Sequence, residues 1–476
     1  MKLIVQSFKW SFLRALVVLL TATLMPVETL SQVANQPSAR HIIICVDGVG
    51  ISTINKMRAD GHFKMFHSPS RMISPFPSLT NAAISKILEP AGAKMTDGYE
   101  DNFFDTEANQ MRGGILDRFR GGRFIRGTFR ELFDYHPSAI KSGLGYAAPP
   151  ISTYLESLSD VIRLRQKARN SRQPVFFAYT GAPDSLAHLG GETLLRSFLK
   201  RLDESVEDLV RDSEVPVVVT IFSDHGNHFR KYRRVSLKTP LKRAGFKIEK
   251  QIKRDQSVVL PQFGLVGSAV LFTNEKNEER LATVLAAVEG VDFTTYERDG
   301  IVYVASKDGE ATIEKREDQY RYLTTKGDPL GLLPITHQLA AWQSQGEHPG
   351  LLPDAPQLTA EEGNGPDGFI SDASWFAATR DTARPDAIRR IFEGATQGVV
   401  NRANVIINFK DGYYTGSSLL DLLTILQATH GNIGQEQSYG FVMSTRQELP
   451  AYIRAGDLWK TLGSPQLRRS QKNPGL

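Results

Sequence analysis

A run of apolar, mostly β-branched residues over 215–222 ends abruptly in the polar sequence Ser-Asp-His. A run of this length, bounded by a proline and a glycine, is typical of a strand that is buried on both faces. Open parallel sheets bind their ligands beyond the carboxyl ends of the strands. Asp224 and His225 would lie at such an end, where they could offer one oxygen and one nitrogen ligand to a metal ion such as zinc. Taken alone, the pair fits a turn followed by a surface histidine better than it fits a metal site.

Two further apolar runs end in the same way. Residues 41–46 lead into Asp47, and residues 173–180 are followed by Asp184 and His188. A spacing of four residues places Asp184 and His188 on one side of a helical turn. As isolated residues, both aspartates also fit helix N-caps, and His188 also fits the surface. Buried strands that alternate with helices, including a long one expected over about 193–212, predict an α/β fold with a mostly parallel sheet.

Thr80 lies at the start of another predicted helix. Two prolines hold the preceding segment extended, and the helical spacing of apolar residues begins at Asn81. Unpaired N–H groups and the dipole at a helix start favour an anion. The Thr80 hydroxyl therefore fits a nucleophile that faces a phosphate, and it also fits an ordinary capping residue. His430 lies in a Thr-His-Gly loop between a helix expected over about 417–428 and a strand expected over 438–443.

The N-terminus has the layout of a secretory signal peptide. Basic residues precede an apolar run over 15–25, which is short for a membrane span, and polar residues follow it. We therefore expect residues 1–34 to be removed, the protein to be periplasmic or secreted, and the mature chain to lack a membrane span. An uncleaved anchor is the alternative.

Charge and cysteine content narrow the possible partners. The formal net charge is +5, and residues 1–34 hold three basic residues and one acidic residue, so the remainder carries 5 − 2 = +3. So mild a charge does not indicate a nucleic-acid partner. The single cysteine, Cys45, lies within a predicted buried strand and excludes an intrachain disulfide.

The expected organisation is one large α/β domain over residues 40–445, with insertions around 90–150 and 265–370 and a C-terminal tail over 446–476. Residues 267–307 have a strand, helix, strand, strand pattern, and we expect loops and short helices over 308–370. The basic, glycine-rich stretch 112–126 could present arginines to an anionic substrate. A solvated loop is the favoured interpretation of that stretch.

Together, these strand ends and loops supply three carboxylates, three imidazoles and one hydroxyl. Because these residues follow one another in this order along the chain, the sequence resembles the alkaline phosphatase superfamily. It is most similar to the branch that contains type I phosphodiesterases/nucleotide pyrophosphatases and phosphonoacetate hydrolases. The resemblance rests on Val-Asp-Gly around Asp47, Pro-Ser-Leu-Thr at 77–80, Asp184 with His188, Ser-Asp-His-Gly at 223–226 and Thr-His-Gly at 429–431.

The resemblance implies an α/β/α sandwich with a smaller inserted α/β subdomain, and a centre of two divalent metal ions, with zinc expected. One ion would be held by Asp184, His188 and His430. The other would be held by Asp47, Asp224 and His225, with the oxygen of Thr80 completing the set. Thr80 would attack phosphorus and form a phosphothreonine, which water would hydrolyse.

Two positions near the nucleophile distinguish branches of the family. In nucleotide pyrophosphatases an asparagine three residues after the nucleophile binds the phosphoryl oxygen, and this chain has Ala83 there. Asn81 directly follows Thr80, as in the phosphonoacetate hydrolases, and we expect it to take that role. The serine motif of the cofactor-independent phosphoglycerate mutases and the Cys/Ser-x-Pro-x-Arg motif of sulfatases are not found in the sequence.

We therefore expect an exported two-metal hydrolase that acts on a small-molecule phosphate ester and resembles phosphodiesterases and nucleotide pyrophosphatases. The sequence leaves several alternatives open. They are a phosphomonoesterase, a phosphonate hydrolase, a phosphotransferase that acts on envelope components, and a metal-binding or ligand-binding protein of the same fold without turnover. The sequence does not indicate an oligomeric state.

Overall fold

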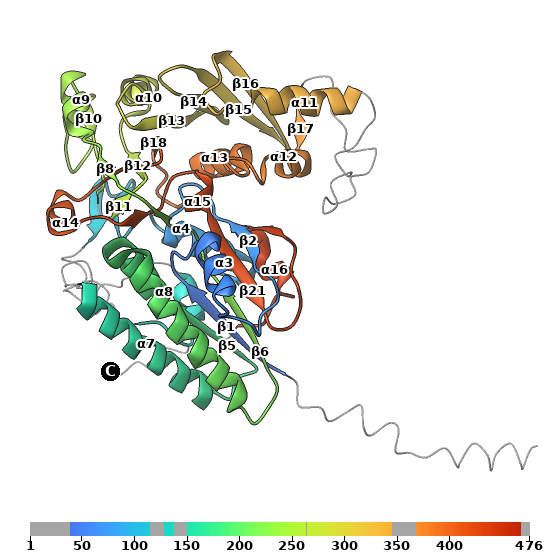
Figure 1. Ribbon diagram of the computed structural model, residues 1–476. Helices are drawn as coiled ribbons and strands as arrows, with labels where there is room; N and C mark the ends of the chain where they lie inside the picture. Colours follow the sequence, from blue (N-terminus) through green and yellow to red (C-terminus); the bar gives the residue numbers. More distant parts are fainter. Residues whose placement is uncertain (1–38, 115–127, 138–149, 263, 345–367, 468–476) are drawn as a thin grey trace, which may run out of the picture.

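The computed structural model describes residues 39–114, 128–137, 150–262, 264–344 and 368–467. Two large sheets lie one above the other in Figure 1, with helices α12 (Asp372–Thr379) and α13 (Ala387–Thr396) between them. The expected signal peptide and most of the basic stretch 112–126 lie outside the described residues. Within the described ranges, no helix combines the length and the apolar composition that crossing a bilayer would require.

The first sheet has six strands, and three of its five strand pairs are parallel. Strand β21 is antiparallel to both of its neighbours, whereas β1 is parallel to β5 and β6. The strands, in sheet order, are β22 (Tyr452–Arg454), β2 (Ser70–Ile73), β21 (Tyr439–Ser444), β6 (Val217–Phe222), β1 (Arg40–Val46) and β5 (Val175–Thr180).

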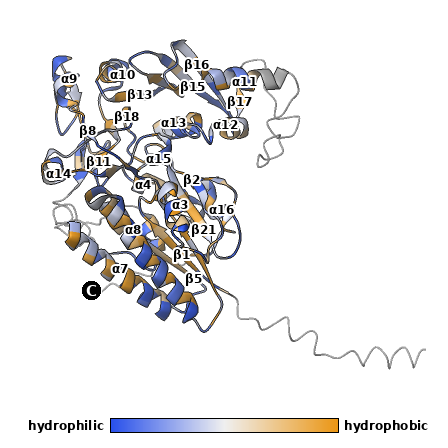
Figure 2. Ribbon diagram, viewed as in Figure 1, coloured by the Kyte–Doolittle hydropathy of each residue, from blue (hydrophilic) through white to orange (hydrophobic). Residues whose placement is uncertain are grey.

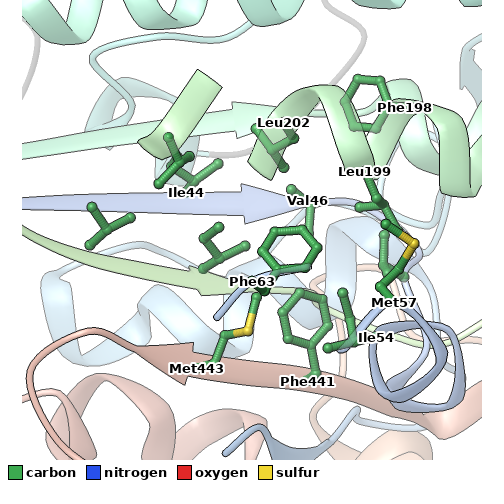
Figure 3. Close-up of a cluster of buried hydrophobic side chains, with 14 of the residues drawn as sticks. Ile44, Val46, Ile54, Met57, Phe63, Phe198, Leu199, Leu202, Phe441 and Met443 are labelled. Atoms are coloured by element: carbon green, nitrogen blue, oxygen red, sulfur yellow. The ribbon is translucent and has the colours of Figure 1, made fainter. Parts of the chain in front are cut away.

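Alternation along β1 creates three layers. Ile42, Ile44 and Val46 face one hydrophobic core, and Ile43 and Cys45 face another. The first core is covered by α3 (Ile51–Ala59), α7 (Pro150–Asn170) and α8 (Ala182–Arg211), and the second by α4 (Thr80–Leu88) and α16 (Leu458–Thr461). Figure 3 shows the first core, in which side chains of β1, α3, α8 and β21 meet. The predicted α/β/α sandwich is confirmed.

Hydropathy follows these layers. Figure 2 shows the strands of the first sheet largely in orange, while the outer turns of α8 are blue. A strand between two helical layers is buried on both faces, which explains why β1, β5 and β6 are continuous apolar runs instead of alternating ones. Cys45 is fully buried and free, as expected for packing.

The second sheet has seven strands, and all of its strand pairs are antiparallel. One face packs against α10 (Glu278–Ala286), and the other packs against α13. Strands β17 and β18 come from beyond residue 369. The strands, in sheet order, are β12 (Ser268–Leu271), β18 (Val405–Phe409), β13 (Val291–Arg298), β14 (Ile301–Ala305), β15 (Glu310–Arg316), β16 (Gln319–Lys326) and β17 (Ile370–Ser371).

The strand, helix, strand, strand pattern predicted over 267–307 is confirmed by β12, α10, β13 and β14. The prediction of loops and short helices after residue 307 is wrong for the hairpin of β15 and β16. Ala311, Ile313, Tyr320 and Tyr322 are buried at alternate positions, which is the period of a strand. A tight turn joins the two strands at Glu317, whose φ is 53°. The 12-residue helix α11 (Leu333–Ser344) follows the hairpin.

Two predicted helices have different limits from those expected. Helix α8 begins at Ala182, well before residue 193, and runs through a non-helical glycine, Gly191 (φ 69°, ψ −168°). The predicted helix over 417–428 is confined to α14 (Ser418–Leu423). The residues before His430 instead form β20 (Ala428–Thr429), because they pair with β7 (His228–Phe229).

Short elements fill the space around the two sheets. Strands β3 and β4 form a hairpin, and β11, β19 and β8 form a three-stranded sheet. Their limits, with those of the remaining short elements, are β3 (Asn102–Asp105), β4 (Gln110–Gly113), β8 (Arg233–Arg234), α9 (Lys238–Arg243), β9 (Lys247–Ile248), β10 (Ser257–Val258), β11 (Leu265–Val266), β19 (Tyr413–Gly416) and α15 (Gln435–Ser438).

Candidate metal centre

The carboxyl ends of β1, β5 and β6 lie at one edge of the first sheet, as the parallel pairing requires. Asp47 follows β1, and Asp224 and His225 follow β6. Asp184 and His188 lie in the first turns of α8, directly after β5. His430 comes from the loop after β20, and Thr80 is the first residue of α4. The structure brings these seven predicted residues together, although they come from segments far apart in the sequence.

The first group of donor atoms belongs to Asp47, Asp224 and His225, which lie close enough to hold one metal ion. His225 Nε2 is 3.3 Å from Asp47 Oδ1 and 3.6 Å from Asp224 Oδ2. Thr80 Oγ1 lies 3.2 Å from Asp47 Oδ1 and 3.2 Å from His225 Nε2. The threonine hydroxyl thus lies beside the donor atoms of this group.

The second group consists of Asp184, His225 and His430. His430 Nε2 is 3.8 Å from Asp184 Oδ1, and the rings of His430 and His225 stack with centroids 3.9 Å apart. His188 Nε2 also approaches Asp184 Oδ1, at 3.3 Å. The family resemblance implies that His188 belongs to the set of Asp184 and His430. In the structure His225 lies between the two carboxylate sites and is a neighbour of both.

Backbone carbonyls orient two of the imidazoles. His430 Nδ1 is 2.8 Å from the carbonyl oxygen of Ser78, and His225 Nδ1 is 3.1 Å from that of Gly226. Each contact leaves the Nε2 atom of the ring facing the carboxylates. Histidines that bind metal ions are commonly oriented in this way through the second ring nitrogen.

The charges of the cluster perturb its pKa values. Burial and the nearby charge of Asp47 raise the pKa of Asp224 well above its ordinary value. Burial opposes protonation of His225, but the charge of Asp224 and the hydrogen bond with Asp47 outweigh it and raise the pKa to about 10. Burial and the charge of His225 lower the pKa of His430 to about 3. Burial opposes ionisation of Asp184, but the charges of His188 and His430 outweigh it and lower the pKa.

These groups fit divalent cations. Asp224 is fully buried, and within the described part of the chain its Oδ2 atom has no hydrogen-bond partner. Several buried carboxylates in close contact are unfavourable unless positive charge compensates them. A mixed set of carboxylate oxygens and imidazole nitrogens is one that zinc and similar transition metals accept. The site residues therefore match the chemistry expected of them.

Two contacts around the cluster are not predicted from the sequence. The Tyr179 hydroxyl donates to Asp47 Oδ2 at 2.5 Å, and the Asn227 amide donates to Asp184 Oδ1 at 2.9 Å. Burial and the charges of Asp47 and Asp224 raise the pKa of Tyr179 well above its ordinary value. The hydroxyl therefore stays protonated and serves as the hydrogen-bond donor to Asp47. Tyr179 pairs with Cys45 in the parallel register, a relation that the sequence alone does not reveal.

A buried arginine fixes the segment before Thr80. Arg390 of α13 donates to Ser78 Oγ at 3.1 Å and to Ser438 Oγ at 2.7 Å. Ser78 also donates its backbone N–H to the Gly431 carbonyl at 3.3 Å. Burial lowers the pKa of Arg390 to about 10, a value at which the guanidinium remains charged at neutral pH. Asn81, the second residue of α4, is buried.

No family model matches the chain, and no curated protein matches it. Solved structures that are similar to it include phosphonoacetate hydrolase from Sinorhizobium meliloti in complex with phosphonoformate, with 12% identity over 90% of this chain and 96% of that one and a TM-score of 0.47. Murine ectonucleotide pyrophosphatase/phosphodiesterase 5 has 10% identity over 91% of this chain and 97% of that one, with a TM-score of 0.43. The human protein has 9% identity over 89% and 93%, with a TM-score of 0.45.

Because these identities and TM-scores are low, we assign the fold from the strand order and the helical layers described above.

Proposed function

We propose that this protein is an exported hydrolase of phosphoric esters that uses two divalent metal ions and the hydroxyl of Thr80. One observation supports the proposal above all. A threonine hydroxyl at a helix start lies 3.2 Å from both Asp47 Oδ1 and His225 Nε2. A hydroxyl among metal-ligand atoms is suited to become a nucleophile, and the helix start beside it favours the phosphate anion.

In this proposal Asp47, Asp224, His225 and Thr80 would hold one ion, and Asp184, His188 and His430 would hold the other, with His225 close to both. The ions would supply positive charge that lowers the pKa of the hydroxyl and offsets the charge of the phosphoryl group. We propose zinc, because its usual ligands match this mixture of oxygen and nitrogen atoms.

The residues of the chain would then act in two steps. The Thr80 oxygen loses its proton to water and bonds to phosphorus, while the bond from phosphorus to the ester oxygen breaks and the leaving alcohol takes up a proton from water. Water next attacks the phosphothreonine and releases phosphate or a phosphomonoester together with free Thr80. Asn81 is proposed to bind a phosphoryl oxygen. The buried contact between Arg390 and Ser78 would hold the segment before Thr80 in place during both steps.

The test compares p-nitrophenyl phosphate with bis(p-nitrophenyl) phosphate as substrates of the purified protein, with added zinc and after chelation. We expect zinc-dependent release of p-nitrophenol, faster from the diester. A faster monoester reaction would assign a phosphomonoesterase. If both esters remain intact but a phosphonate is cleaved, the protein is a phosphonate hydrolase. If metal-loaded protein cleaves neither of the esters nor the phosphonate, the proposal is contradicted and a binding protein is favoured.

Export has its own test. Expression of the full chain with a C-terminal tag in a Gram-negative host, followed by fractionation, should give a periplasmic product that begins near residue 35. A full-length product in the cytoplasm would contradict export without affecting the proposed chemistry.

A further inference from the structure

Among the described residues, each carboxylate site has one side-chain hydrogen-bond donor that lies outside the set of predicted ligands, and the backbone N–H of Gly48 also donates to Asp224 Oδ1 at 3.2 Å. Asp47 directs Oδ1 toward Thr80 and His225, while its Oδ2 atom accepts the Tyr179 hydroxyl at 2.5 Å. Asp184 Oδ1 accepts the Asn227 amide at 2.9 Å. Tyr179 comes from β5 and Asn227 from the loop after β6, so the two donors belong to different parts of the sheet edge.

Tyr179 is suited to hold Asp47 in one orientation. The tyrosine side chain is fully buried in the core between the first sheet and α4, and it packs against Phe133 with ring centroids 5.5 Å apart. Packing leaves the hydroxyl little freedom to move away from Asp47. Because Oδ2 is occupied by this hydrogen bond, Asp47 has Oδ1 available for a cation.

Asn227 has a comparable relation to Asp184. Its amide nitrogen also donates to the Gly48 carbonyl at 2.8 Å, which ties the loop after β1 to the loop after β6. The space is tight, because a Cβ atom at Gly48 would lie 2.5 Å from Asp184 Oδ1 and 2.7 Å from Asn227 Nδ2. A side chain at position 48 would therefore displace both Asp184 and Asn227.

We propose that Tyr179 and Asn227 are positioning residues that tune the two metal sites separately, Tyr179 through Asp47 and Asn227 through Asp184. This inference rests on the metal centre of the proposed function. Partners of metal ligands fix the ligand's direction and its basicity, and their loss commonly weakens metal binding by about 10–100-fold. A donor that contacts only one carboxylate is expected to act mainly on the ion that this carboxylate holds.

The experiment titrates metal-free full-length protein with zinc in competition with a chromogenic chelator, so that two binding steps can be resolved. The variants are Tyr179→Phe and Asn227→Ala. Asp224→Ala and His188→Ala assign the steps to the two sites. We expect Tyr179→Phe to weaken the zinc-binding step that is assigned by Asp224→Ala by about 10–100-fold. Asn227→Ala should weaken the step that is assigned by His188→Ala by a similar factor, and each variant should have little effect on the other step.

Matched controls separate this role from ordinary stabilisation. Tyr322→Phe also removes a buried hydroxyl that donates to a carboxylate, that of Asp328, at 2.7 Å in the second sheet. Asn404→Ala removes an amide that donates to Glu278 at 2.7 Å beside the second sheet. Both controls should lower the melting temperature as much as the test variants do, and both should leave the two zinc affinities unchanged.

Each result decides the matter. If either test variant weakens both steps equally, or neither step, or if the controls weaken zinc binding as strongly, the inference is wrong. Wild-type protein that binds no pair of zinc ions would overturn both the inference and the proposed function. Selective weakening in a protein that hydrolyses no ester would uphold the inference and contradict only the proposed function.

Discussion

Thr80 is the residue on which the proposed chemistry most directly depends. We expect Thr80→Ala to lower turnover of a phosphate ester by about 10³-fold or more, since no other hydroxyl is proposed to attack phosphorus. Metal content should remain nearly intact, because Asp47, Asp224 and His225 remain in the same group. Steady-state kinetics and metal analysis of the same preparation test both statements.

Thr80→Ser is the matched variant, because it keeps a hydroxyl and removes only a methyl group. It should retain a substantial part of the activity that Thr80→Ala loses. Undiminished turnover by Thr80→Ala, or loss of both metal ions, would contradict the role assigned to this residue.

Residues at strand ends could be predicted, whereas those that support them could not. Asp47 and Asp224 stand out in the sequence because each follows an apolar run, and the structure brings both to one cluster. Tyr179 lies inside such a run, where a tyrosine is indistinguishable from core packing. Arg390 lies in an amphipathic helix, where an arginine predicts a solvent-exposed face, yet it is only 4% exposed. The roles of Tyr179 and Arg390 depend on hydrogen bonds to residues far away in the sequence, Asp47 and Ser78, which a local pattern does not reveal.

At the scale of elements, the loop after β6 passes so close to α15 and β21 that only glycine fits. A Cβ atom at Gly226 would lie 2.2 Å from the Glu436 carbonyl oxygen and 2.7 Å from that of Tyr439. Both contacts are with backbone, which cannot rotate away. We expect Gly226→Ala to lower the free energy of unfolding by about 1–3 kcal/mol and to weaken zinc binding, because the clash lies next to His225.

Gly50→Ala is the control for this clash. It is also close to the cluster, but the nearest atoms to its Cβ would be 3.6 Å away and its φ is −72°. Denaturant titration should show a smaller change for Gly50→Ala, about 0.5 kcal/mol, because alanine is a poorer helix N-cap than the Gly50 that precedes α3. Equal effects of the two substitutions would refute the steric explanation.

A histidine in β1 should make stability depend on pH. His41 is buried, and its Nε2 lies 2.8 Å from Thr220 Oγ1 of β6. Burial, and then the charge of Arg446, lower its pKa from 6.5 to about 4. Between pH 6.5 and about pH 4 the unfolded chain binds a proton at His41 more readily than the folded chain does. The free energy of unfolding therefore has its full value above pH 6.5 and falls as pH decreases toward 4.

The change attributable to His41 is on the order of 3 kcal/mol. The free energy of unfolding should therefore depend less steeply on pH in His41→Gln than in wild type. The difference between the two slopes should correspond to up to about one proton taken up on unfolding. Denaturant titrations at several pH values measure both slopes. Identical slopes in the two proteins would show that His41 does not titrate differently in the folded state.

Elements buried on both faces were the most predictable from sequence. The apolar runs at 41–46 and 173–180 correspond to β1 (Arg40–Val46) and β5 (Val175–Thr180). The hairpin of β15 and β16 was missed because charged residues occupy its outer face and weaken the apolar signal. The helix predicted before His430 was too long, because pairing of β20 with β7 overrides the local helical pattern.

For the molecule as a whole, the question is what joins the two sheets. Helix α13 packs against the second sheet, while Gly394 in that helix approaches the Phe76 carbonyl so closely that a Cβ atom would lie 2.2 Å from it. Arg390 of the same helix reaches Ser78, beside the metal centre. The second sheet thus reaches the segment before Thr80 through α13, and it also contacts the site directly, because the Gly267 N–H, just before β12, donates to the His430 carbonyl at 2.7 Å.

A second junction involves an arginine of the first sheet whose side chain is only 14% exposed. Arg454 of β22 donates to Asp386 Oδ2 and Oδ1 at 2.8 and 2.9 Å, and to Asp372 Oδ2 and Oδ1 at 2.6 and 2.8 Å. Both aspartates belong to the helical layer under the second sheet. Burial raises the pKa of Asp386, and the charge of Arg454 opposes that rise. The arginine therefore compensates a carboxylate that has little access to water.

Arg454→Met should destabilise the whole protein, because it leaves Asp386 without its partner in the interior. The expected loss is about 3–5 kcal/mol in the free energy of unfolding. Adding Asp386→Asn to that variant should restore part of the loss, since it removes the uncompensated charge. Arg201→Met is the control, because its pair with Glu204 is exposed, with side-chain exposures of 58% and 43%. That control should cost much less than Arg454→Met, because water screens an exposed ion pair, and equal costs for the two variants would show that the junction between the sheets does not depend on the pairing of Arg454.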